Sequence, residues 1–213
     1  GGELCGGEQM TKVVAITGGI GSGKSEVCRI FAESGFAFQY NADARAKALY
    51  VEYPALLEAI ETELGERFTD PEGHFLSHRL AARIFNDQDA LNTVEGLLFP
   101  VMMEDFAAFA EASDAEMVVF ESATMLEKPQ FDGFADKVIL VDAPFQTRLD
   151  RACSRDGASR EAVLARMRAQ TLMNDLSEGA HDPRVDYVIV NDSTLEVLRE
   201  RTRKTIELLT ENI

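Results

Sequence analysis

The stretch "AITGGIGSGKSEV", residues 15–27, decides the fold of this chain. Four glycines, two serines and a lysine follow an apolar run, and residues 18–25 fit the pattern GxxxxGK[ST]. Residues without a Cβ atom let backbone N–H groups converge on a polyphosphate, and a helix that begins at the loop points its positive dipole end at the same place. The stretch therefore predicts a strand, a phosphate-binding loop and a helix.

The residues of this loop are the expected contacts of a nucleotide. Lys24 is expected to reach the β- and γ-phosphates of ATP and to take part in catalysis, and the Ser25 hydroxyl is expected to bind Mg²⁺. No NKxD-like base reader of GTPases is present, which favours small-molecule kinases. The predicted ATP-binding residues of the loop are Gly19, Ile20, Gly21, Ser22, Gly23, Lys24, Ser25 and Glu26.

The composition limits the other classes of function. The chain has 213 residues, 46% of them hydrophobic, and a formal net charge of −16, which argues against a nucleic-acid partner. No apolar run is long enough to span a bilayer, so no membrane partner is expected. Three cysteines without CxxC spacing indicate reduced thiols and a cytoplasmic location. Residues 1–10 are expected to be a disordered leader or a tag remnant, and the sequence sets no oligomeric state.

The order of apolar runs and turn signals predicts an α/β fold. The runs typical of strands are 12–17, 36–43, 117–123, 137–144 and 186–192. Helical spans separate them, which predicts a parallel five-stranded sheet flanked by helices. Residues 11–44 and 115–213 are expected to form a nucleotide-binding core, and residues 45–114 a mainly helical insertion whose longest helix breaks near Pro100.

Asp43 follows the second predicted strand. The carboxyl ends of parallel strands share the sheet edge that carries the phosphate loop, so a carboxylate there can accept a proton from a substrate hydroxyl or orient it. An aspartate at this position can equally cap the helix that follows. The residues alone leave these two interpretations evenly balanced.

Arginines gather between residues 148 and 168. Six arginines stand against three acidic residues, a local excess of +3 in a chain of net charge −16. Arg148, Arg151 and Arg155 are spaced i, i+3, i+7 and are expected to share one helix face. Such a face is either a solvated surface or a basic lid over a transferring phosphoryl group, and the contrast with the rest of the chain favours a lid at about residues 145–182.

Five stretches, in this order, resemble the dephospho-CoA kinase family: "TGGIGSGKS", "NAD" with "RAKAL", "PQFDGFADKVILVDAP", "RLDRACSRDGASREAVLARMRAQ" and "DYVIVND". They span nearly all of residues 12–195, and the arginine-rich string is more specific than the glycine loop, which many kinases share. The resemblance implies a P-loop kinase fold with a CoA-side insertion and a lid. It also implies transfer of a phosphoryl group from ATP to the ribose 3′-hydroxyl of dephospho-CoA, the last step of coenzyme A synthesis.

The resemblance carries roles onto matching positions. It implies that Asp43 is the catalytic base, that Arg151 is a charge-stabilising catalytic arginine and that Arg155 lies near the phosphates. Asn191, at the end of the last strand, is implied to lie near adenine. Glu26 stands where the family commonly has threonine and adds a negative charge to the first helical turn.

The resemblance also bears on the acceptor. Arg79 and Arg83 are implied contacts of the CoA pyrophosphate. Asn41 stands where an aspartate is common and Phe99 where a histidine is usual, which puts a second carboxylate and one insertion contact in doubt. Glu121 takes an acidic position at the end of its strand, as a water-mediated Mg²⁺ ligand or as a structural residue, with neither favoured.

Two other functions stay open at this point. One is a nucleoside or nucleotide kinase that uses the same loop and lid with a different acceptor. The other is a nucleotide-binding switch without acceptor chemistry, for which Asp43 would not matter.

Overall fold

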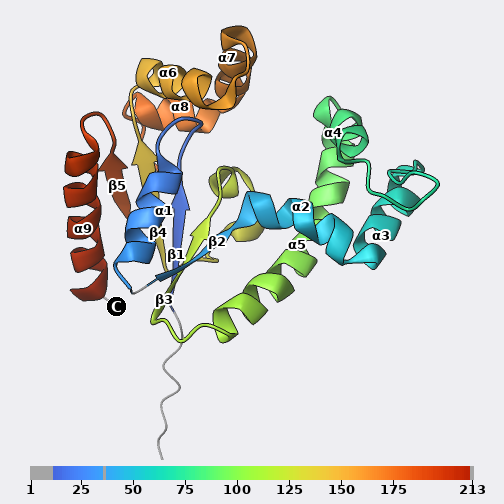
Figure 1. Cartoon of the computed structure of the whole chain (residues 1–213), viewed down its shortest axis with the longest axis horizontal. Helices are drawn as coiled ribbons and strands as arrows, with labels where there is room; N and C mark the ends of the chain where they lie inside the picture. Colours follow the sequence, from blue (N-terminus) through green and yellow to red (C-terminus); the bar gives the residue numbers. More distant parts are fainter. Residues whose placement is uncertain (1–11, 36, 212–213) are drawn as a thin grey trace, which may run out of the picture. The chain divides into compact units, whose positions relative to one another are not determined.

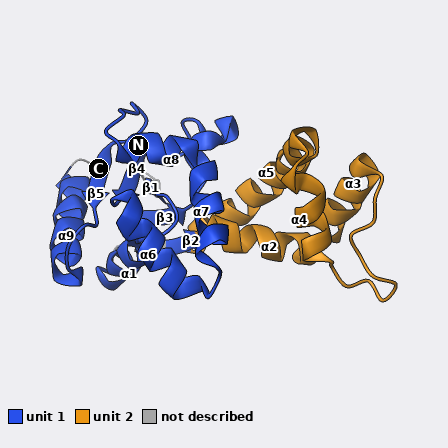
Figure 2. Ribbon diagram, turned by 90° about the horizontal axis from the view of Figure 1, so that it is seen from above, with its two compact units in different colours: residues 1–40, 113–213 blue, residues 41–112 orange. Residues whose placement is uncertain are grey.

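The computed structural model describes residues 12–35 and 37–211. The chain divides into two compact units, residues 1–40 with 113–213 (unit 1) and residues 41–112 (unit 2), which Figure 2 shows in different colours. The predicted leader, residues 1–10, lies outside the described residues. None of the helices in the described ranges is both long and apolar enough to cross a bilayer.

A five-stranded parallel sheet forms the centre of unit 1 (Figure 1). Its strands are β1 (Lys12–Thr17), β2 (Ala37–Asn41), β3 (Met117–Glu121), β4 (Lys137–Asp142) and β5 (Tyr187–Val190). They lie in the order β2-β3-β1-β4-β5, so the predicted sheet is confirmed. In the register, Val14 of the central strand β1 is paired with Val119 of β3, and Ile16 with Ile139 of β4.

One face of the sheet is covered by α1 (Lys24–Glu33) and α9 (Leu195–Glu211), which lie side by side in Figure 1. Alternate strand residues such as Ile16 form one hydrophobic cluster with Phe31 of α1 and Leu209 of α9. Because parallel strands are buried on both faces, their sequences are continuous apolar runs. The position of the loop after β1 is therefore fixed by the central strand of the sheet.

The opposite face of the sheet carries an aromatic cluster centred on Phe120 of β3. Its ring lies 5.6 Å from the ring of Tyr40 and 4.9 Å from that of Phe134, measured between centroids. The short 3₁₀ helices η1 (Met125–Glu127) and η2 (Pro129–Phe131) follow β3, and Phe131 of η2 joins this cluster.

Three helices after β4 form the arginine-rich segment: α6 (Phe145–Asp156), α7 (Arg160–Ala169) and α8 (Thr171–Ser177). Gly157 ends α6 with a φ of 61°, and the Ser159 hydroxyl accepts the backbone N–H of Ala162 at the start of α7 (3.2 Å). Leu149 and Ala152 of α6 and Val163 and Met167 of α7 share a small hydrophobic cluster. This segment therefore has a core of its own.

Unit 2 is helical in its described residues, with α2 (Ala42–Glu52), α3 (Pro54–Leu64), α4 (Ser77–Phe85) and α5 (Gln88–Glu111). The predicted break near Pro100 is wrong, because α5 runs through it without interruption. The buried stripe of α5 repeats every four residues on both sides of the proline, at Val94, Leu98, Met102 and Phe106. A proline inside a helix costs about 3 kcal/mol. Each buried apolar side chain contributes roughly 1.5–3 kcal/mol, so packing outweighs the lost hydrogen bond.

Candidate active site

The phosphate loop, residues 18–25, runs from the carboxyl end of β1 into the first turn of α1. Gly21 and Gly23 have φ angles of 74° and 99°, in the left-handed region that favours glycine. Gly23 is the N-cap of α1 and provides no side-chain cap, so the positive end of the helix dipole faces the loop. This geometry suits a bound phosphate.

Neighbouring atoms lie very close to the loop, which explains why several of its residues are glycines. A Cβ atom on Gly18 would collide with the carbonyl oxygen of Val141, and one on Gly23 with the side-chain amide of Asn191. A Cβ atom on Gly21 would collide with backbone atoms of Arg148. Glycine at these positions therefore serves the packing of the loop as well as its conformation.

Two hydroxyl groups of this region are buried without a hydrogen-bond partner in residues 12–35 and 37–211: Thr17 Oγ1 and Ser22 Oγ. Native proteins satisfy nearly all buried polar groups, so an exception indicates a ligand, an ion or water. Together with the uncapped helix end, these donors show that the loop fits an anionic ligand such as the polyphosphate of ATP.

Asn191 and Arg151 brace the loop from two sides. Asn191, 9% exposed, donates its side-chain N–H to the carbonyl oxygen of Ser22 (3.0 Å). Arg151 donates to the carbonyl oxygens of Gly21 (3.4 Å) and Asn191 (2.8 Å). Both residues named from the sequence thus lie at the phosphate loop.

The three spaced arginines of α6 have different surroundings. Arg148 is buried, with 1% of its surface exposed, so at this residue the shared face is not a solvated surface. Arg151 is half-buried against the loop, and Arg155 is exposed and paired with Asp156 (2.8 Å). At Arg148 the surface of α6 faces the loop and not solvent. Helical periodicity alone does not reveal what a helix face packs against.

Ser25 and Glu121 bring two oxygen ligands together at the end of the loop. The Ser25 hydroxyl lies 3.5 Å from Glu121 Oε1, and Gln39 donates to Glu121 Oε2 (3.1 Å). Glu121 is 3% exposed at the carboxyl end of β3. Mg²⁺ takes oxygen ligands at about 2.0–2.1 Å and keeps several waters, so this pair fits the ion with the hydroxyl as a direct ligand and the carboxylate behind a water.

The first turn of α1 places further charges beside this pair. Glu26 is bound by Arg29, which partly offsets the extra negative charge near the loop. Cys28 is fully buried, and burial first and the charge of Glu121 second raise the pKa of its thiol. Cys28 is therefore a protonated core residue and not a nucleophile.

Asp43 lies in unit 2, in the first turn of α2, and is exposed. The N-cap of α2 is Asn41, whose side chain accepts the backbone N–H of Ala44 (3.0 Å). The capping role that the sequence leaves open for Asp43 therefore belongs to Asn41.

Arg79 and Arg83, one turn apart on α4, share the carboxylate of Glu66. The two Nε–oxygen distances are 3.2 Å and 3.3 Å. Arg83 also pairs with Asp87 (2.5 Å), whose pKa is lowered first by the backbone N–H of Ala90 and second by Arg83. The two arginines form one cationic pair on unit 2 that is already partly neutralised.

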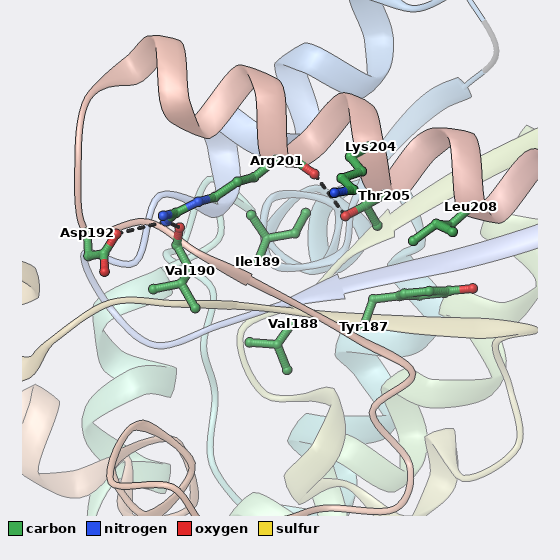
Figure 3. A pocket seen from close by; sticks show the side chains of 9 residues that line it. All are labelled: Tyr187, Val188, Ile189, Val190, Asp192, Arg201, Lys204, Thr205 and Leu208. Carbon is green, nitrogen blue, oxygen red and sulfur yellow. Dashed lines mark hydrogen bonds and ion pairs between the residues drawn. The ribbon is translucent and has the colours of Figure 1, made fainter.

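A groove of about 440 Å³ lies along the outer edge of the sheet, between β5 and α9 (Figure 3). Arg201 crosses its end and donates to the carbonyl oxygen of Val190 (2.6 Å) and to Asp192 (2.8 Å). No residue of the phosphate loop lines the groove, so it is separate from the candidate active site.

Two contacts to the loop were not assigned to the site from the sequence. Gln170, between α7 and α8, accepts the backbone N–H of Ile20 through Oε1 (2.9 Å). Arg148 reaches Gly19. The sequence signal for both is their place in the arginine-rich string, but only the tertiary structure shows that this string packs on a loop 130 residues away.

The comparisons agree on one family. The profile of the dephospho-CoA kinase family matches residues 12–196. A dephospho-CoA kinase of Porphyromonas gingivalis is 36% identical over 169 residues, which cover 79% of this chain and 82% of the relative. That of Chlorobaculum tepidum is 36% identical over 203 residues, covering 92% of this chain and 94% of the relative.

Solved structures give the same fold. A Thermus thermophilus crystal structure aligns with a TM-score of 0.78 at 28% identity, covering 93% of this chain and 97% of the other. The dephospho-CoA kinase of Campylobacter jejuni aligns with a TM-score of 0.62 at 21% identity, covering 95% and 99%. Shikimate kinase from Acinetobacter baumannii, with a TM-score of 0.53 at 17% identity and coverages of 96% and 96%, shares the fold alone. With its phosphate loop, its parallel sheet and a profile match over most of its length, this chain belongs to the dephospho-CoA kinase family.

Proposed function

We propose that this protein transfers the γ-phosphoryl group of ATP to the ribose 3′-hydroxyl of dephospho-CoA, giving CoA and ADP. The observation that carries the proposal is the uncapped, glycine-lined phosphate loop at the carboxyl edge of the sheet, in a chain of this family.

The nucleotide side uses residues 19–26 and the two residues that brace them. Lys24 reaches the β- and γ-phosphates in this proposal, and its place as the first residue of α1, after the left-handed Gly23, supports the role. Arg151 stabilises the charge that spreads over the transferring group, and its contacts with the loop support this role. Arg155 lies near the phosphates as a residue of the lid. Asn191 is the residue we expect near adenine, and its hydrogen bond to the carbonyl oxygen of Ser22 supports a place beside the nucleotide.

Ser25 and Glu121 would hold Mg²⁺. The 3.5 Å between their oxygens supports one direct and one water-mediated ligand. An ion bound there would neutralise charge on the β- and γ-phosphate oxygens.

The acceptor side uses residues of unit 2. Asp43 accepts the proton of the 3′-hydroxyl, whose oxygen forms a bond to the γ-phosphorus while the bond from that phosphorus to the β,γ-bridging oxygen breaks. Its place in the first turn of α2, directly after β2, supports this role. Arg79 and Arg83 bind the pyrophosphate of the acceptor in exchange for part of their pairing with Glu66.

The domain roles follow the same division. Residues 11–44 and 115–213 form the nucleotide core, residues 45–114 the CoA-side insertion and about residues 145–182 the lid, where the internal cluster of α6 and α7 supports one rigid piece. A cytoplasmic location stays a prediction from cysteine usage, and the oligomeric state is left open.

A substrate panel tests the proposal. The protein is incubated with ATP and Mg²⁺ alone, with dephospho-CoA, and with nucleosides and nucleoside monophosphates, and products are followed by ³¹P NMR. We expect a new 3′-phosphomonoester with dephospho-CoA only. Phosphorylation of a nucleoside or nucleotide in its place would indicate another small-molecule kinase, and slow hydrolysis without any acceptor would indicate a nucleotide switch.

A further inference from the structure

We propose that Arg148 is a positioning residue of the nucleotide site: a buried cation that packs against the phosphate loop and holds positive charge there for the polyphosphate. The inference deepens the proposed function and rests on it only for the identity of the ligand. Nothing in the sequence distinguishes Arg148 from the other arginines of α6.

The guanidinium of Arg148 is held in one place. Its Nε donates to the carbonyl oxygen of Ala143 (3.0 Å), and its Nη2 donates to Asn174 Oδ1 (3.2 Å) and Ser177 Oγ (3.3 Å). The Phe145 ring lies 5.4 Å from its Cζ atom, within cation–π range. Four contacts from α6, α8 and the end of β4 therefore fix a side chain that is only 1% exposed.

One donor of this guanidinium is left over. Nη1 is buried and has no hydrogen-bond acceptor in residues 12–35 and 37–211. It points at the loop, because a Cβ atom on Gly19 would lie 2.5 Å from it. No carboxylate in the same described ranges forms a salt bridge with Arg148. A buried charge without a direct counter-charge is costly, and a nearby bound anion removes that cost.

The carboxylate whose charge acts on Arg148 is that of Asp142, and it is already engaged. Asp142 accepts hydrogen bonds from the Ser177 hydroxyl (2.6 Å) and the backbone N–H of Ala143 (2.8 Å). Its charge raises the pKa of Arg148, but burial has the larger effect and lowers it. An arginine stays protonated even so, and its positive charge is thus only partly balanced within the protein.

The loop is joined to the arginine-rich segment along its length. The backbone of Arg148 packs on Gly21, and Ile20 packs on the cluster that contains Leu149 and Val163. Gln170 accepts the backbone N–H of Ile20. The charge of Arg148 therefore keeps a fixed place beside the loop, as preorganised electrostatic stabilisation requires.

This arrangement predicts selectivity by phosphate charge. Loss of the cation should weaken the binding of nucleotides that place a β-phosphate in the loop, whereas loss of a merely structural side chain should weaken the binding of all nucleotides alike. ATP and ADP place their β-phosphate in the loop, and AMP does not.

Isothermal titration calorimetry on the full chain with Mg²⁺ and ATP, ADP or AMP tests the inference. For Arg148→Gln we expect about a tenfold loss of ATP and ADP affinity and less than about a twofold change for AMP. Arg148→Lys, which keeps the charge, should lie closer to the wild type. Arg203→Gln is the matched control, because Arg203 is an exposed arginine of α9, outside the phosphate loop and the arginine-rich segment, and it should bind like the wild type.

A double-mutant cycle keeps the test valid if Arg148→Gln fails to fold. Gly19→Ala should weaken ATP binding in the wild type, and less so in Arg148→Lys, whose shorter head group leaves room for the methyl group. Equal losses for ATP and AMP, unchanged ATP affinity in a folded Arg148→Gln protein, or full additivity in the cycle would overturn the inference. Failure of the wild type itself to bind ATP would instead overturn the proposed function.

Discussion

The phosphate loop and the arginine pair of α4 both offer positive charge, yet they are built differently. Loop residues Gly18 and Gly19 are buried, and side chains from α6 and the end of β5 hold the loop. Arg79 and Arg83 have side chains that are 53% and 31% exposed, and both form ion pairs with the carboxylate of Glu66. The difference indicates that the nucleotide end is formed before any ligand arrives. At the proposed acceptor end, by contrast, an anionic substrate must replace existing ion pairs of the arginines.

The largest expected effect is on the phosphoryl-transfer step itself, with the binding of ATP and of the acceptor left intact. Asp43→Asn should lower kcat by about 10²–10⁴-fold, because the amide cannot accept the proton of the acceptor hydroxyl. ATP affinity, measured by calorimetry, should stay within a factor of about three, since Asp43 does not serve the loop.

Asp89→Asn is the matched control for that change. Asp89 lies in the first turn of α5, after the Asp87 cap, as Asp43 lies in the first turn of α2 after the Asn41 cap. It should leave kcat unchanged. A parallel loss of ATP affinity and kcat in Asp43→Asn would mean that this carboxylate serves the metal.

The second-largest effect is expected from a change in the phosphate loop, the preformed end of the site. Lys24→Met should lower kcat/KM for ATP by about 10²–10³-fold, because one donor to the developing charge is removed. The change should not depend on which acceptor is offered, and steady-state kinetics at varied ATP measure it. Lys204→Met on α9 is the control, and an equal loss there would point to a general charge effect rather than to the loop.

A smaller effect concerns the metal. Glu121→Gln keeps the shape of the side chain and removes the charge beside Ser25. We expect the Mg²⁺ concentration for half-maximal activity to rise about 10–100-fold with kcat recovered at saturating Mg²⁺, the range found for residues behind a direct ligand. An unchanged Mg²⁺ dependence would leave Glu121 with a structural role only.

The smallest effect belongs to the acceptor end. Arg79→Gln and Arg83→Gln should each raise KM for dephospho-CoA by about three- to tenfold, since each removes one exposed charge-assisted contact. KM for ATP should not change. If KM for ATP rose instead, the contrast between the two ends would be lost.

The sequence predicts the fold of unit 1 well and the surroundings of its loop poorly. Glycine spacing and strand order are local signals, and both are confirmed by the sheet and the family match. The continuity of α5 through Pro100 depends on packing that extends over its whole length. The burial of Arg148 depends on which side of α6 meets a loop far away in sequence, and helical periodicity gives a face without naming its neighbour.

The most direct measurement is a crystal structure with a non-hydrolysable ATP analogue and Mg²⁺. We expect the β-phosphate inside the phosphate loop, within hydrogen-bond distance of backbone amides of residues 21–25, with the ion next to the Ser25 hydroxyl. An analogue bound at another place with the loop left empty would contradict the proposed nucleotide site and everything built on it.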